Sequence, residues 1–204
     1  ILGLESLSAG TVEFAGEPVA ANDRSWRRLR RRVQMIFQDP TGALNPRRTI
    51  YEAVAEGIRI HRLPGSEPEL VAESLSRAGL RPAQRYMTRF PHEVSGGQRQ
   101  RVLIAGAMVL DPQLLLADEP VASLDASVRG EILALMRSLV DETGISIIAV
   151  THDLGLAWNI ADRIAVMYLG RIVEVGGAEE LLADPQHPYT RALLSVVPEA
   201  ERLD

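Results

Sequence analysis

Apolar and polar positions alternate with two different periods along this chain. Short, mainly apolar runs occur at Val33–Phe37, Leu114–Ala117 and Ile145–Val150, and each is typical of a buried strand. Helical spacing of apolar residues follows over 127–142 and 153–161. Apolar strands that alternate with helices are typical of a parallel sheet covered on both faces, so the pattern predicts an α/β fold.

Helical periodicity dominates the middle of the chain. Helices are expected over 49–61, from Ser66 to near Gly79, and over 98–110. The second begins with Ser66-Glu67-Pro68-Glu69, the pattern of a capping box. We therefore expect a core in two parts, 1–43 and 109–175, an α-helical subdomain inserted at 44–108, and a short C-terminal extension at 176–204.

The composition excludes several kinds of chemistry. All 22 basic side chains are arginine, and 27 acidic side chains give a net charge of -5. Without lysine or cysteine, these residues contain no P-loop lysine, disulfide, thiolate metal site or cysteine nucleophile. The longest apolar stretch, 102–110, is far shorter than the roughly 20 residues of a transmembrane helix. An acidic chain is not, as a whole, a nucleic-acid-binding surface.

Six arginines stand between residues 24 and 32, around Trp26 and Leu29. One interpretation is a patch that binds a membrane surface or nucleic acid. The other, which we favour, is a solvated face whose arginine stems cover Trp26 and Leu29.

Paired carboxylates follow the second apolar run. Asp118 and Glu119 stand at its carboxyl end, which is where open α/β sheets bind ligands. Asp118 is suited to hold Mg²⁺ through water, and Glu119 to polarise a water molecule. The alternative is a solvated strand end with a helix cap.

Three other places carry candidate chemistry. Ser95-Gly96-Gly97-Gln98 precedes a helix, so its backbone N–H groups and hydroxyl are suited to bind an anion. Gln38 and His152 each follow an expected strand, where the first is suited to contact a metal or water and the second a phosphate. The alternatives are an ordinary serine-capped helix, a polar surface glutamine and a structural histidine.

In combination these segments resemble the ATP-binding-cassette (ABC) ATPases, which have a P-loop NTPase-like core. The resemblance covers nearly the whole chain, because five motifs occur in the family's order. They are the Q-loop at Gln38, the signature at Ser95–Gln98, the Walker B strand at Leu114–Glu119, the D-loop at Ser123–Asp125 and the H-loop at His152.

Two further segments resemble one subfamily, the importers of dipeptides, oligopeptides and nickel. These are Phe37-Gln38-Asp39-Pro40 with Ala43-Leu44-Asn45-Pro46, and the tail His187-Pro188-Tyr189-Thr190-Arg191-Ala192-Leu193-Leu194. The alternative for the tail is a plain amphipathic helix entered through a proline break.

The resemblance implies a mechanism in which two cassettes enclose two ATP molecules. Ser95, Gly96, Gly97 and Gln98 would bind the ATP held by the partner, and Asp125 would contact that partner. Asp118 and Gln38 would hold Mg²⁺, Glu119 would polarise the attacking water, and His152 would stabilise the γ-phosphate. The implied partners are a second ABC subunit, identical or paralogous, transmembrane permease subunits and, indirectly, an extracytoplasmic substrate-binding protein. The implied location is the cytoplasmic face of the cell membrane, with no role for nucleic acid.

The departures from the family pattern are as informative as the matches. The P-loop and its lysine should lie just before residue 1, so we expect an N-terminally truncated chain in which Ile1–Leu4 ends the P-loop helix. Two alternatives remain open. One is a non-catalytic fragment that presents only the signature face, and the other is a non-transport ABC ATPase of DNA repair or translation.

Overall fold

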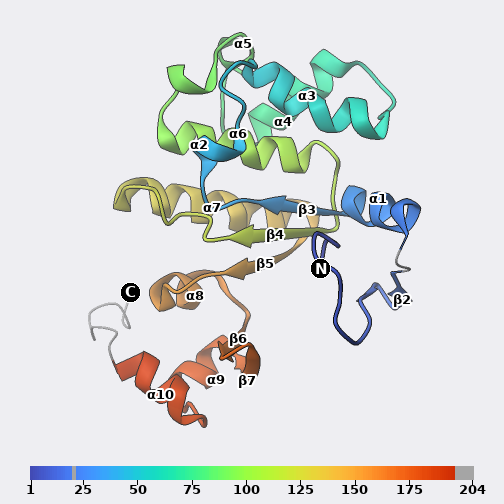
Figure 1. The fold of residues 1–204 in the computed structure, drawn as a ribbon. Helices are drawn as coiled ribbons and strands as arrows, with labels where there is room; N and C mark the ends of the chain where they lie inside the picture. The colour runs from blue at the N-terminus through green and yellow to red at the C-terminus, as the bar shows by residue number, and fades with distance from the viewer. Residues whose placement is uncertain (20–21, 196–204) are drawn as a thin grey trace. The chain divides into compact units, whose positions relative to one another are not determined.

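A three-stranded parallel sheet organises the first part of the computed structural model, which describes residues 1–19 and 22–195 (Figure 1). Its strands are β3 (Val33–Ile36), β4 (Leu114–Asp118) and β5 (Ser146–Val150), in the order β3-β4-β5. Ile36 pairs with Ala117, and Ala117 with Ala149. The carboxyl ends of the three strands therefore meet at one edge, and the parallel α/β prediction is confirmed.

Strand β5 differs from the prediction of a strand buried on both faces. Ile148 is 47% exposed and Val150 is 61% exposed, whereas Leu115 and Ala117 of β4 are buried. β3 and β5 are both edge strands of this sheet, but Val33 and Ile36 of β3 are buried, so the exposure is particular to β5.

Helices fill the sequence between β3 and β4, and Figure 1 shows them gathered on one side of these strands. They are α2 (Pro40–Ala43), α3 (Ile50–His61), α4 (Glu67–Arg77), α5 (Gln84–Met87), a 3-10 turn (Pro91–Glu93) and α6 (Gly96–Met108). Helix α6 packs against α3 and α4, and Val54, Leu75 and Ile104 are fully buried there. The Ser74 hydroxyl donates to the Ala105 carbonyl at 2.6 Å. These helices agree with the expected helical segment, whose boundaries remain a prediction.

The start of the chain departs from the expected helix. Residues 1–4 are irregular, and a two-stranded antiparallel hairpin follows, β1 (Glu13–Phe14) and β2 (Glu17–Pro18). The arginine-rich segment is the helix α1 (Asp23–Arg32), capped by the Asn22 side chain, which accepts from the Ser25 N–H.

Two arginines of α1 make tertiary contacts and are not merely solvated. Arg30 donates to the carbonyls of Leu2 and Gly3. Arg32 donates to the Gln113 side chain and stacks 4.7 Å above the centre of the Phe14 ring. Leu29 is buried, as the favoured interpretation required.

The chain divides into two compact units, Ile1–Val150 and Thr151–Asp204. The first also contains α7 (Ala126–Thr143). The second holds α8 (Leu154–Ile160), the antiparallel pair β6 (Arg163–Tyr168) and β7 (Arg171–Gly177), and helices α9 (Ala178–Ala183) and α10 (Pro188–Ser195). Its core is formed by Ile164, Val166, Ala178 and Leu181. None of the helices in the described part of the chain is long and apolar enough to cross a membrane.

Glu174 of β7 holds the start of α10. Its two carboxylate oxygens accept from the backbone N–H groups of Gln186 and His187 at 2.7 and 3.0 Å. The hydroxyl of Thr190, followed by the Gln186 N–H, holds the pKa of Glu174 below its ordinary value. One carboxylate on a strand thus orders the segment that leads into the helix.

Candidate functional site

Gln38 and Asp118 lie at the same edge of the parallel sheet. Asp118 is the last residue of β4, and Gln38 stands two residues beyond the end of β3, the strand paired with it. Gln38 is exposed and Asp118 is half-buried. The structure therefore brings two oxygen-bearing side chains to the ligand-binding edge that the sequence predicted.

Glu119 has an unusual backbone conformation, which the sequence did not predict. Its φ of 47° lies in the left-handed region, where residues with a Cβ are strained. Its N–H donates to the Val150 carbonyl at 2.9 Å, and its carbonyl accepts from the Ala122 N–H at 3.2 Å. These bonds hold the turn in place, and strained residues of this kind concentrate at active sites.

The donor atoms at this edge suit magnesium. A carboxylate from Asp118 and an amide oxygen from Gln38 are hard oxygen ligands, and Mg²⁺ is usually bound by one or two such groups together with water and phosphate. Within residues 1–19 and 22–195, no group of three or more His, Cys, Asp or Glu is arranged to hold a metal. Asp118 and Gln38 as ligands of Mg²⁺ therefore remain a prediction.

The signature segment forms the N-terminal end of α6. The Ser95 hydroxyl oxygen accepts from the Gln98 N–H at 3.2 Å, and the Gln98 side chain accepts from the Ser95 N–H at 3.0 Å. Ser95 keeps its hydroxyl hydrogen, and Gly96 and Gly97 present first-turn N–H groups that no helical carbonyl can accept. The end of the helix thus offers three donors to an anion, while the Gln98 side chain is engaged in the cap.

Arg99 links the signature segment to the segment after Gln38, a contact that the sequence did not predict. Its guanidinium donates to the Thr41 hydroxyl at 3.3 Å and to the Pro91 carbonyl at 2.8 Å. Asp39, next to Gln38, accepts from the Thr41 N–H. No sequence signal marks this contact, because Arg99 and Thr41 stand 58 residues apart.

Asp125 occupies the N-cap position of α7 without capping it. Its carbonyl accepts from the N–H groups of Val128 and Arg129, but its side chain makes no cap hydrogen bond. The Arg129 guanidinium donates to the neighbouring Leu124 carbonyl at 2.9 Å. The exposed Asp125 carboxylate is therefore not used to start its own helix.

His152 belongs to the second unit, two residues after the end of β5. Its predicted role remains a prediction, as do the roles of Glu119 and of the signature residues.

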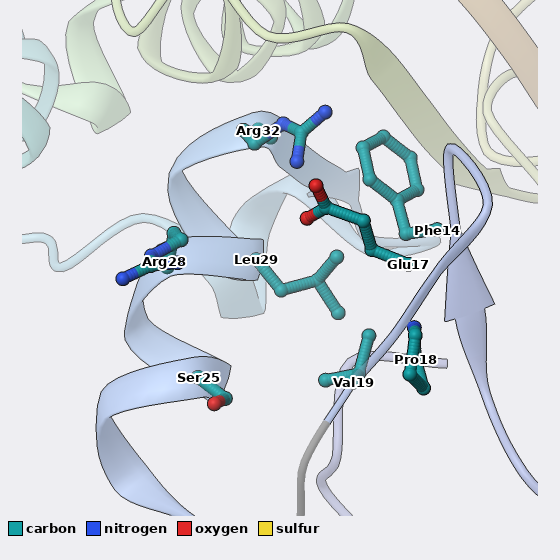
Figure 2. A pocket seen from close by; sticks show the side chains of 8 residues that line it. All are labelled: Phe14, Glu17, Pro18, Val19, Ser25, Arg28, Leu29 and Arg32. Atoms are coloured by element: carbon teal, nitrogen blue, oxygen red, sulfur yellow. The ribbon is translucent and has the colours of Figure 1, made fainter.

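A small hollow lies away from these residues, between α1 and the β1–β2 hairpin (Figure 2). Figure 2 shows the Leu29 side chain pointing across it from α1, with Arg32 beside Phe14 and Glu17. Its volume is about 60 Å³, whereas sites for drug-sized ligands measure about 300 Å³ or more. It is therefore too small to be a nucleotide site.

Comparison with known proteins identifies the family. The family model described as ABC transporter matches residues 1–122, more than half of the chain. The chain belongs to the ABC transporter family. A second model, the C-terminal region of oligopeptide/dipeptide transporters, matches residues 173–204.

Curated relatives of this ABC protein are named for oligopeptide transport or for glutathione import. The oligopeptide transport ATP-binding protein OppF of Bacillus subtilis is 43% identical over 97% of the chain, and OppF of Escherichia coli is 44% identical over 97%. The glutathione import ATP-binding protein GsiA of Escherichia coli is 44% identical over 98%. The matched regions cover 66%, 60% and 32% of these proteins, so the chain spans less than two thirds of the relatives it matches.

Two solved structures share the fold. CbiO1 from Clostridium perfringens, described as part of the ABC transporter complex cbiONQ, has a TM-score of 0.81 and 30% identity over 99% of this chain and 78% of its own. The ATP-binding cassette MJ0796, a dimer bound to ADP and Pi, has a TM-score of 0.73 and 28% identity over 86% of this chain and 76% of its own. The predicted P-loop NTPase-like fold is thereby confirmed.

Proposed function

We propose that this chain is part of the ATP-binding subunit that energises an ABC importer of peptides or nickel, and that ATP is hydrolysed where two such subunits meet. The observation that carries the proposal is that one chain contains both a helix start suited to bind an anion and a carboxylate pair at the edge of a parallel sheet. Donors for an anion stand at the start of α6, and Asp118 with Glu119 stands at the edge of the sheet. Family membership supports the same conclusion.

Peptides are the favoured cargo class. The match to the oligopeptide/dipeptide transporter region, together with relatives named for oligopeptide and glutathione transport, supports this choice. Nickel remains within the proposal, because the resemblance of the tail does not separate the two kinds of cargo.

Each candidate residue has a role in this proposal. Ser95, Gly96 and Gly97 donate to the γ-phosphate of the ATP held by the partner subunit, and Glu119 polarises the water that attacks it. His152 stabilises the charge that develops on the phosphate. Asp118 and Gln38 would hold Mg²⁺, which when bound would neutralise negative charge on the phosphates.

Gln98 and Asp125 have supporting roles. Gln98 fixes the shape of the signature loop through its cap, and Asp125 contacts the partner subunit across the interface.

The proposal requires a lysine that this sequence does not contain. A P-loop lysine binds the β- and γ-phosphates in this class of ATPase, and none of the 204 residues is lysine. The P-loop has to come from chain outside these residues. Micromolar ATP binding by these 204 residues alone, measured by calorimetry, would contradict that requirement.

The proposed assembly is peripheral to the membrane. Two ATP-binding subunits, identical or paralogous, bind transmembrane permease subunits on the cytoplasmic face, and a substrate-binding protein delivers cargo on the other side. We propose no role for nucleic acid.

The test of the proposed function is Glu119→Gln in the intact transporter. The amide cannot polarise water as a carboxylate does, so ATP binding should persist while turnover falls by about 100-fold or more. Binding of radiolabelled ATP measures the affinity, and the release of phosphate measures the turnover. The exposed Glu73 on α4 supplies the control, Glu73→Gln, which should change neither. Unchanged turnover in Glu119→Gln would reject the assigned role.

A further inference from the structure

The N-terminal end of α6 packs directly against the first turn of α7 in the same chain. A Cβ added to Gly97 would stand 2.5 Å from the Val128 Cγ1 atom, and one added to Gly96 would stand 3.7 Å from the Leu124 Cδ2 atom. Carbon atoms in favourable contact are about 3.5–4.0 Å apart. Position 97 therefore has no room for a side chain, and the obstacle lies within the chain itself, whatever ligand binds from outside.

The first turn of α7 cannot easily move aside. Valine is β-branched and has one strongly preferred rotamer in a helix, so Val128 has little freedom to turn its methyl group away. The N–H groups of Val128 and Arg129 donate to the Asp125 carbonyl at 3.0 and 2.9 Å. A displacement of Val128 is thus transmitted to the backbone of Asp125.

The other contact in this cluster is also fixed. Leu124 is only 7% exposed, and its carbonyl accepts from the Arg129 guanidinium. Leu124, just before Asp125, is therefore held by burial and a hydrogen bond. Val128, three residues after Asp125, is held by its close contact with Gly97.

We propose that Val128 is a positioning residue that couples the signature segment to Asp125 within one chain, and that Gly97 provides the close contact through which the coupling acts. The inference rests on the proposed function, because it assumes that the signature segment binds ATP and that Asp125 contacts the partner subunit. A movement of either segment on binding then displaces the other, since no gap separates them.

The experiment is a size exchange in the intact transporter with Gly97→Ala, Val128→Ala and the double variant. Gly97→Ala should lower the turnover number for ATP about tenfold, and it should speed amide hydrogen exchange at 95–98 and at 124–129 without nucleotide. Val128→Ala removes both γ-methyl groups, so the double variant should recover turnover to within about threefold of wild type and restore the exchange rates.

Gly106→Ala is the matched control. It lies on the same helix, and an added Cβ meets no atom within 4 Å there. It should leave both turnover and exchange at the two segments unchanged, which separates the clash at position 97 from a general effect of alanine in α6.

The outcomes distinguish the coupling from the proposed function. If Val128→Ala rescues neither measurement in Gly97→Ala, the glycine is required only for what approaches from outside, and the inference fails. Rescue of exchange without rescue of turnover would also overturn it, because the contact would then be structural only. A wild-type transporter that hydrolyses no ATP would refute the proposed function, and the exchange experiment would still report on the contact.

Discussion

At the scale of single residues, Glu119 combines candidate chemistry with a strained backbone. Its left-handed φ follows from the change of direction at the end of β4, where its N–H pairs with the Val150 carbonyl and its carbonyl closes a turn with Ala122. A residue with a Cβ costs about 1–2 kcal/mol in this conformation. The fold thus accepts strain at the residue proposed to activate water.

Comparison of Glu119→Gly with Glu119→Ala isolates this strain, because both remove the carboxylate. Glycine adopts the left-handed region without penalty, so we expect the glycine variant to be more stable than the alanine variant by about 1 kcal/mol. Denaturant unfolding of the two variants measures the difference. An alanine variant of equal or greater stability would show that position 119 is not strained.

At the scale of elements, similar sequence patterns at two helix starts give different structures. Thr49 caps α3, since its hydroxyl oxygen accepts from the Glu52 N–H and the Glu52 carboxylate accepts from the Thr49 N–H. The predicted capping box at Ser66 is wrong, because the Ser66 side chain makes no cap hydrogen bond at the start of α4.

Tertiary contacts hold the start of α4 in its place. The Glu67 carboxylate accepts from the Tyr51 hydroxyl at 2.7 Å and from the Arg59 guanidinium at 2.9 and 2.6 Å. Arg59, and then Tyr51, hold the pKa of Glu67 below its ordinary value through these hydrogen bonds. The start of α4 is therefore fixed by hydrogen bonds from Tyr51 and Arg59 of α3 to Glu67.

This contrast predicts unequal costs for the same kind of substitution. Thr49→Ala should lower the free energy of unfolding by about 1 kcal/mol, because it removes a side-chain cap. Ser66→Ala removes no hydrogen bond at its helix start, so its effect should be within about 0.5 kcal/mol of zero. Chemical denaturation compares them, and equal losses would mean that Ser66 caps α4 after all.

At the scale of the whole molecule, the two family matches fall in different units. The ABC transporter match ends at residue 122, inside the first unit, and the peptide-transporter match begins at residue 173, inside the second. In the second unit, the Glu174 carboxylate of β7 accepts hydrogen bonds from the backbone that leads into α10. Within the segment that resembles peptide importers, one carboxylate thus joins β7 to the start of α10.

The stability that Glu174 contributes should depend on pH. Its pKa is lowered in the folded chain, so the contribution is complete above the ordinary value of 4.5 and is lost as the pH falls below it, through the lower folded value. Glu174→Gln should therefore unfold at a lower temperature than wild type at pH 7, with a gap that narrows below pH 4.5. Glu73→Gln serves as the exposed control, and a gap that stayed constant with pH would contradict the role of the charge.

The sequence by itself placed the strands of the parallel sheet and indicated the family, but it predicted a helix at 1–4 that the structure does not contain. Apolar runs placed β3, β4 and β5 to within a residue or two, because strands are rich in β-branched and other apolar residues, although one face of β5 is exposed. The order of Gln38, the signature, Asp118 with Glu119, and His152 resembles that of the ABC ATPases, and the family match agrees with this resemblance.

Only the tertiary structure decided how these pieces meet. The strain at Glu119, the contact between Arg99 and Thr41 and the packing of Gly97 on Val128 join residues through space, and no periodicity records such contacts. The cap that formed at Thr49 and failed at Ser66 has the same origin, because a local pattern competes with whatever partner the fold brings near. A sequence pattern indicates which residues of an element are apolar, whereas the close contacts of a site depend on which other residues the fold packs against them.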